Sequence, residues 1–274
     1  MSSILTNNSA MVALQTLKSI NSNLSQTQGE IATGKSVSSA KDNSAVWAIS
    51  KVMESDVSGF NAISDSLSLG QATVAVASAG AEQITDLLTQ MKEKVVAATG
   101  ENVDHAKITA DVTELKNQIT SVIDASQFNG ANLLNTAGGD VTILSSLDRD
   151  AAGAVTASNI TVASVDFEAG LDLTTVDVTS ATAADTSLAA IETLIQSAVD
   201  GTAALGASQK RVDDQGSFVS KLTDAMKSGI GALVDADMEE ASARLQSLQV
   251  QQQLGVQSLS IANQGAQSIL SLFR

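Results

Sequence analysis

The chain has no cysteine, no proline and no tyrosine, and its only aromatic residues are one tryptophan and five phenylalanines. Without cysteine it can form no disulfide, thiolate metal site or cysteine nucleophile. Without proline it lacks the strongest interrupter of helices, so unusually long helices are possible. The 43% hydrophobic content comes mainly from small aliphatic side chains. This composition favours helices packed closely against one another over a thick globular core.

The charge balance excludes two classes of partner. Fifteen basic and thirty acidic residues give a net charge of −15, the wrong sign for neutralising nucleic-acid phosphates or for lying on an anionic bilayer. We therefore expect neither nucleic-acid binding nor membrane insertion. Residues 245–273 contain no charge, but their eight glutamines and five serines exclude a transmembrane helix. Residues 1–17 lack the basic region and continuous apolar stretch of a secretory signal, so we expect any export to use another route.

The clearest periodic signal is a seam of residues spaced alternately by three and four, from Val46 to Ala98. Fourteen of its sixteen positions are apolar, the exceptions being Asp56 and Gly70. This spacing is typical of a helix that packs along one face. Such a helix would be about 80 Å long, whereas a compact globule of this chain length would be roughly 50 Å across. The sequence therefore predicts an elongated, rod-like protein.

The middle of the chain changes character twice. A second helix is predicted over residues 108–122, ending near the turn-like Gln127-Phe128-Asn129-Gly130. Residues 135–180 are rich in β-branched side chains, and we expect strands at 141–144, 159–163 and 173–178. Between residues 136 and 200 there are ten acidic residues and one basic residue, Arg149, which suits a solvated outer surface. Helical spacing resumes over 188–233 and shifts phase at 235–237.

The two ends of the chain resemble each other. Both carry apolar residues at helical spacing, both are nearly free of charge, and both are rich in Gln, Asn and Ser. A helix of this kind gains too little by itself to offset its ordering entropy. We infer that the ends are mobile in the monomer and become ordered against copies of the same chain. The predicted subunit-interface residues are Leu14, Leu17, Leu24, Ile31, Leu245, Leu248, Leu259, Ala262, Asn263, Ile269 and Phe273.

Four segments resemble bacterial flagellin. The stretch over residues 31–50 resembles the family's Gly, Ser-Ala-Lys-Asp-Asp and Ala-Ile-Ser run, and residues 127–134 resemble its Phe-Asn-Gly turn. Asp235-Ala236-Asp237 and the ending from Ala262 to Arg274 resemble its C-terminal signature. The resemblance covers about the first 135 and the last 90 residues and leaves the β-rich insertion outside. The short chain with its small insertion is similar to the compact flagellins of alphaproteobacteria.

The resemblance implies a structural subunit that polymerises into the flagellar filament used for swimming. Such a subunit is exported through the flagellar type III channel without a cleaved signal peptide, and it is extracellular. The partners implied are copies of the same chain, sister flagellins, the filament cap, the hook-filament junction proteins and an export chaperone. A hook-filament junction protein has similar ends and remains the alternative function. O-linked sugars around residues 140–200 are a further hypothesis, because this region would face outward.

The fold class expected is mainly α, an elongated antiparallel coiled-coil or helical-bundle rod with terminal helices and a small β-rich insertion. Five segments are predicted. Residues 1–42 form the N-terminal polymerisation helix and connector, and 43–134 the first part of the helical rod. Residues 135–184 form the surface-exposed insertion, 185–234 the returning helix, and 235–274 the C-terminal polymerisation helix.

Enzymatic readings have little support in the sequence. Residues 29–36 fit the P-loop pattern G-x-x-x-x-G-K-[ST], but a helical seam precedes them where a P-loop has a buried strand. We expect a glycine-containing loop at a helix end. His105, the only histidine, is expected to face solvent near a helix start, and neighbouring pairs such as Asp213-Asp214 are expected to be solvated. We predict no enzyme activity, metal site or cofactor.

Overall fold

The computed structural model describes residues 7–150 and 153–272, with side chains described as far as residue 264. The chain divides into two compact units. Unit 1 comprises residues 1–55 and 225–274, and unit 2 comprises residues 56–224. The long helices α2 (Ser44–Ala98) and α5 (Ala181–Val234) contribute to both units. The fold class expected from the sequence, mainly α with antiparallel helices and a small β-rich insertion, is confirmed.

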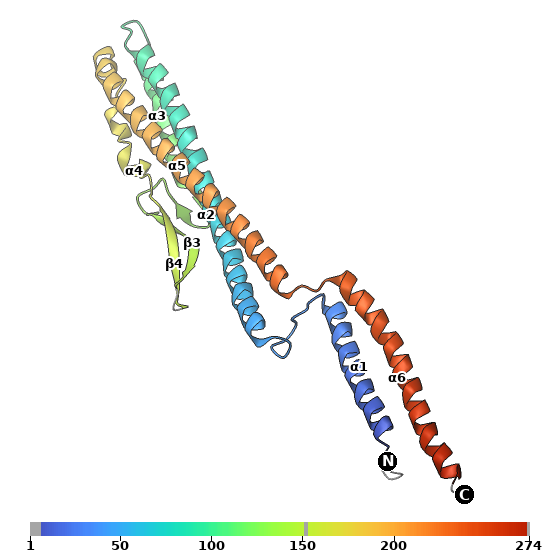
Figure 1. Ribbon diagram of the computed structural model, residues 1–274. Helices are drawn as coiled ribbons and strands as arrows, with labels where there is room; N and C mark the ends of the chain where they lie inside the picture. Colours follow the sequence, from blue (N-terminus) through green and yellow to red (C-terminus); the bar gives the residue numbers. More distant parts are fainter. Residues whose placement is uncertain (1–6, 151–152, 273–274) are drawn as a thin grey trace. The chain divides into compact units, whose positions relative to one another are not determined.

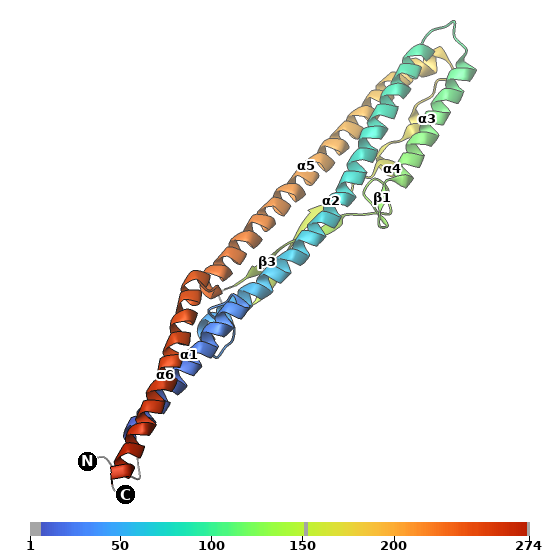
Figure 2. The same ribbon diagram turned by 90° about the vertical axis from the view of Figure 1, so that its right-hand side faces the viewer.

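Unit 1 is built around two terminal helices that lie side by side and antiparallel, α1 (Asn8–Thr33) and α6 (Met238–Leu272) (Figures 1 and 2). The Asn7 side chain caps the start of α1 by accepting a hydrogen bond from the Ala10 N–H, 3.1 Å. Gly34 ends α1 with a left-handed φ of 69° and donates its N–H to the Glu30 carbonyl, 2.9 Å. The helix ends are therefore encoded locally.

Unit 2 is an elongated helical bundle. Within it α2 and α5 run antiparallel, and α3 (His105–Ala125) packs back along α2 (Figures 1 and 2). The seam predicted for α2 forms the core of this unit, with Ile63, Val74, Ile84, Leu88 and Met91 fully buried. Ile119 from α3 and Ile191 and Leu205 from α5 complete this core. The three-four spacing therefore identified the packed face of α2 correctly within unit 2.

The segment that follows α3 begins with a tight two-residue turn. Strands β1 (Gln127–Phe128) and β2 (Ala131–Asn132) pair antiparallel. Between them Asn129 and Gly130 have φ values of 50° and 83°, the left-handed conformations that such a hairpin turn requires and that Asn-Gly adopts most readily. The buried Asn132 side chain donates to the Ile123 carbonyl, 2.7 Å, which satisfies a carbonyl at the end of α3. The predicted Phe-Asn-Gly turn is confirmed.

The β-rich insertion is a single long hairpin of β3 (Val141–Arg149) and β4 (Val155–Val162). The strands expected at 141–144 and 159–163 are confirmed. The strand expected at 173–178 is wrong, because Leu173–Thr175 form a 3-10 turn (η1) capped by the Asp172 carboxylate. Lys116 of α3 donates to the Val176 carbonyl, 2.7 Å, so this segment is tied to α3 and pairs with no strand. A short helix α4 (Phe167–Gly170) was not anticipated.

The hairpin docks on α2 at the two positions that interrupt the apolar seam. Arg149 Nη2 lies 2.5 Å from Asp56 Oδ1. A Cβ at Gly70 would lie 2.6 Å from Ile143 Cγ1 and closer still to Cδ1, so only glycine leaves room for this side chain. Gln215 of α5 donates to the Ser145 carbonyl of β3, 2.8 Å. The interruptions in the seam therefore mark where the insertion is attached.

Candidate assembly surface

The α1–α6 pair buries few residues for its length. Leu24 and Thr27 of α1, and Ala241 and Leu248 of α6, are buried. Leu17 and Ile20 lie against Gly255, whose missing side chain lets the two helices approach closely. Apart from this narrow seam, both helices are largely exposed. The pair therefore leaves much of its uncharged surface without a partner among the described residues.

Polar contacts join the two helices at three levels. The Gln252 side chain donates to Asn21 Oδ1, 2.7 Å, and the Asn7 side chain donates to the Ala262 carbonyl, 2.9 Å. Near the other end of the pair, Arg244 Nη1 lies 3.9 Å from Glu30 Oε2. These contacts define which residues of α6 lie level with which residues of α1.

Large apolar side chains project from the pair away from its seam. On α6 the side chains of Val250, Leu254 and Ile261 are 55%, 56% and 64% exposed. At 100° per residue these three lie within about 40° of one another, on the side of the helix opposite Leu248. A groove of about 730 Å³ opens between the two helices, lined by Asn8, Ser9, Val12, Ala13, Ser258, Ile261 and Ala262. From residue 245 onward, the outer face of α6 therefore combines exposed apolar side chains with an absence of charge.

The predicted interface residues fall into three groups. Leu24 and Leu248 are buried in the seam, and half-buried positions near it are Leu17, Ile31, Leu245, Leu259 and Ala262. Leu14 and Asn263 are exposed. The side chain of Ile269 and all of Phe273 lie outside the described residues. The role of this set in contacts between copies stays a prediction.

The three-four spacing misses the outward residues. Met11, Val12, Val250, Leu254, Val256 and Ile261 fall between the seam positions and are more than half exposed. The sequence signal that could have identified them is the lack of charge around the whole circumference of α6 beyond Arg244, because a helix that is solvated on one side normally carries charge there.

The segment that fits the P-loop pattern is a connector. Gly34 lies at the C-terminal end of α1, where the helix dipole is negative and repels phosphate. Ser36 N–H donates to the Val234 carbonyl, 2.7 Å, and Ala236 N–H donates to the Gly34 carbonyl, 2.9 Å. The backbone that would hold a phosphate is thus paired with the link between α5 and α6. The predicted loop at a helix end is confirmed.

The connector continues into a turn organised by Asp42. One oxygen of this carboxylate accepts the N–H groups of Ser39, 2.9 Å, and Ser38, 3.2 Å, together with both hydroxyls. The Ser39 N–H and hydroxyl, with the Ser38 hydroxyl, lower the pKa of Asp42 below its ordinary value. The next residue, Asn43, caps α2 by accepting the Val46 N–H, 3.2 Å. The Ser-Ala-Lys-Asp run therefore shapes the entry into α2.

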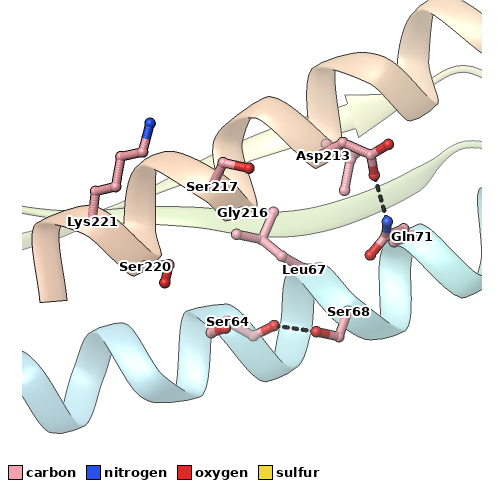
Figure 3. A pocket seen from close by; sticks show the side chains of 10 residues that line it. Ser64, Leu67, Ser68, Gln71, Asp213, Gly216, Ser217, Ser220 and Lys221 are labelled. Carbon is pink, nitrogen blue, oxygen red and sulfur yellow. Dashed lines mark hydrogen bonds between the residues drawn. The ribbon is translucent and has the colours of Figure 1, made fainter. Parts of the chain in front are cut away.

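The other candidate groups form no reaction centre. His105 is half-buried at the first turn of α3 with Nδ1 3.2 Å from the Val178 carbonyl, so the expectation that it faces solvent is wrong. Figure 3 shows a groove between α2 and α5 in unit 2, where Gln71 donates to Asp213, 2.6 Å. Within the described residues no cluster of three potential metal ligands occurs, and none of the described helices has an apolar stretch of the length that a membrane span requires.

Comparison with known proteins finds matches to one family in both units. Residues 4–138 match the bacterial flagellin N-terminal helical region, and residues 188–273 match the bacterial flagellin C-terminal helical region. The chain belongs to the bacterial flagellin family. Flagellin FljM of Caulobacter vibrioides is 44% identical, with all of this chain and 99% of that protein covered. A flagellin of Brucella melitensis is 42% identical, with both chains covered completely.

Family membership establishes the role of this flagellin. It is a structural subunit of the bacterial flagellar filament, the motility apparatus outside the cell, and it belongs to a structural family. Caulobacter vibrioides has several related flagellins, among them FljM, FljO and FljK, each 42–44% identical to this chain. The relatives thus imply a self-polymerising filament subunit. Both matched regions include the terminal helices, which carry the uncharged surface.

Proposed function

We propose that this flagellin joins its neighbours in the filament through the outward faces of α1 and α6. The observation that carries this proposal is the stripe of Val250, Leu254 and Ile261, which is at least 55% exposed on a helix without charge from residue 245 to residue 264. Full burial of one such side chain contributes about 1.5–3 kcal/mol. Neighbouring copies can supply that burial, because they offer the same uncharged face.

The predicted interface residues take two roles in this proposal. Those in the seam, such as Leu24 and Leu248, hold α1 and α6 together. Those that are exposed, Leu14 and Asn263, lie outside the stripe and make further contacts between copies. The Gln and Ser side chains between the apolar positions can form hydrogen bonds across the new contacts. Closing these contacts supplies the partners that the ends lack in the single chain, so assembly completes their packing.

The finer partners and the export route belong to the same proposal. The chain is carried through the flagellar type III channel without a cleaved signal peptide, and an export chaperone holds it beforehand. It is added beneath the filament cap, and the first copies bind the hook-filament junction proteins. It carries out no catalysis. These statements are supported by membership of a structural family.

Placing a single charge in the stripe tests the proposed surface. Leu254→Lys should abolish elongation of purified chains, because burying an unpaired ammonium costs several kcal/mol. Val199→Lys is the matched control, since Val199 is also an exposed aliphatic residue, 44%, on helix α5 of unit 2. Sedimentation and electron microscopy measure filament yield, and circular dichroism checks the fold. Full-length filaments from Leu254→Lys would contradict the proposal.

Polymer length also distinguishes the alternative function. A filament subunit should elongate into long polymers from purified chains added to short filament seeds. A junction adaptor would bind the seeds and stop. The relatives from Caulobacter vibrioides and Brucella melitensis, matched over 99% and 100% of their lengths, are named flagellins, which supports the filament subunit.

A further inference from the structure

The seam between α1 and α6 contains a level at which both helices present a side-chain amide. Gln252 Nε2 donates to Asn21 Oδ1, 2.7 Å. Stepping away from this pair by three or four residues in opposite directions brings Leu24 level with Leu248, and Leu17 level with Gly255. The second match is direct, because a Cβ at Gly255 would lie 3.1 Å from Leu17 Cδ1. The amide pair is thus flanked on one side by two leucines and on the other by a leucine that lies against a glycine.

A cross-helix charge pair lies near one end of the same seam. Arg244 Nη1 is 3.9 Å from Glu30 Oε2, and Arg244 Nη2 is 2.6 Å from Glu240 Oε1. The Glu30 side chain is only 13% exposed, so water compensates its charge less than that of a surface carboxylate. Across α1 and α6 this is the one ion pair among the described side chains. This ion pair requires the same alignment of α6 along α1 as the amide pair.

Displacement of one helix along the other would break both pairs. The next positions at which the apolar seams could match are seven residues away, about 10 Å along the axis. At those positions Asn21 would be level with Leu245 or Leu259. In the single chain Asn21 is exposed and Gln252 is half-buried. Once neighbours cover the seam, an amide without a partner carries its full desolvation penalty, so the alternative registers become unfavourable on assembly.

We propose that the Asn21–Gln252 amide pair, supported by Glu30–Arg244, selects the register of α1 against α6 and thereby the pattern of the assembly surface. The register decides which exposed residues of α1, such as Met11 and Val12, stand beside Val250, Leu254 and Ile261. Apolar seams alone tolerate displacement by a heptad, whereas a single matched polar level does not. These four residues act as positioning residues for assembly. This inference rests on the proposed function of the same surface.

The absence of cysteine allows the register to be read directly by cross-linking. Leu17→Cys with Gly255→Cys reports the register of the structure, and Leu17→Cys with Leu248→Cys reports a displacement of one heptad. A disulfide requires Cα atoms within about 7 Å, so the two pairs are mutually exclusive. Each pair is placed in the native chain, in Asn21→Leu with Gln252→Leu, and in the exchanged variant Asn21→Gln with Gln252→Asn. Mild oxidation during seeded assembly gives the yields, and cysteine-free versions are assayed for filaments.

The native chain should favour the first cross-link by roughly tenfold or more, the effect of one unmatched amide. In Asn21→Leu with Gln252→Leu, the all-leucine variant, the displaced cross-link should rise to a comparable yield. This variant should also form fewer and irregular filaments, while its melting temperature should not fall. The exchanged variant should restore the native pattern and the filaments, because it retains the amide pair and the total side-chain volume.

Three results would overturn the inference. One is an all-leucine variant that gives only the first cross-link. Another is a displaced register with normal filaments. The third is an exchanged variant that behaves like the all-leucine variant. Each cross-link forms within one chain, so it reports register during assembly even if Leu254→Lys leaves assembly intact. That outcome would contradict the proposed surface and leave the register selection standing.

Discussion

Arg149 is the only basic residue between residues 136 and 200, and its guanidinium contacts Asp56, one of the two residues that interrupt the apolar seam of α2. Nη2 lies 2.5 Å from Asp56 Oδ1 and Nε lies 3.4 Å from Oδ2, so the contact is two-pronged. The Asp56 carboxylate raises the pKa of Arg149 above its ordinary value. The acidic residue that interrupts the apolar seam of α2 and the basic residue of the acidic insertion are therefore partners in one ion pair.

Removing this contact should loosen the hairpin alone. In Arg149→Ala, hydrogen exchange of the β3 and β4 amides should accelerate by roughly two- to fivefold, the range of a partly exposed ion pair. Amides of the α2 core near Ile84 should be unaffected, because Ile84 is fully buried and belongs to the helical bundle. Asp56→Ala should give the same pattern. Acceleration throughout unit 2 would show that the contact holds the bundle as well.

Adding a side chain at Gly70 of α2 should destabilise the protein. In Gly70→Ala the new methyl would lie 2.6 Å from Cγ1 of Ile143 and closer still to its Cδ1, so strand β3 has to move. We expect a loss of about 1–2 kcal/mol in the free energy of unfolding, after the gain in helix propensity of about 1 kcal/mol is included. Denaturant unfolding of the purified monomer measures this difference.

Gly206→Ala is the matched control for Gly70→Ala. Gly206 lies within α5, and a Cβ there would meet nothing within 4 Å. This variant should gain about 0.5–1 kcal/mol through helix propensity alone. Equal stabilisation by both alanines would mean that Ile143 does not occupy the space above Gly70.

Acid should open the turn before α2. The lowered pKa of Asp42 means that its folded-state carboxyl releases its proton more readily than in the unfolded chain. The stability it contributes is therefore present above the ordinary value of 3.8 and is lost as the pH falls through the lower folded-state pKa. We expect the Ser38 and Ser39 amide resonances to move together as the pH falls below 3.8, the ordinary value. In Asp42→Asn these two amides should show no such transition.

The P-loop-like segment should bind no nucleotide. Its backbone N–H groups at Gly34 and Ser36 are already paired with carbonyls, and the adjoining helix end is negative. Calorimetry with ATP and Mg²⁺ should give only heats of dilution, and Lys35→Ala should give the same trace. A saturable heat that disappears in Lys35→Ala would contradict this assignment.

Much of the helical architecture could be predicted from periodicity because helix packing repeats along the chain. The three-four spacing placed the buried face of α2, and Asn129-Gly130 marked the turn after α3. The segment at 173–178 could not be assigned in this way. Its Thr and Val residues favour a strand locally, and the competing signal of Asp172, which caps the 3-10 turn from the position before it, was missed. The hydrogen bond from Lys116 comes from its tertiary surroundings. His105 was misjudged for the same reason, since Val178 is distant in sequence.

The sequence by itself determined the long helices, the chain's resemblance to flagellin and the absence of charge at its ends, because these depend on composition and on local spacing. The tertiary structure decided which apolar residues of the ends face each other and which remain exposed. Two helices leave several equivalent ways to match one periodic seam with another. The pairing of Asn21 with Gln252 and of Leu17 with Gly255 distinguishes among them, and that pairing determines which exposed residues of α1 stand beside Val250, Leu254 and Ile261.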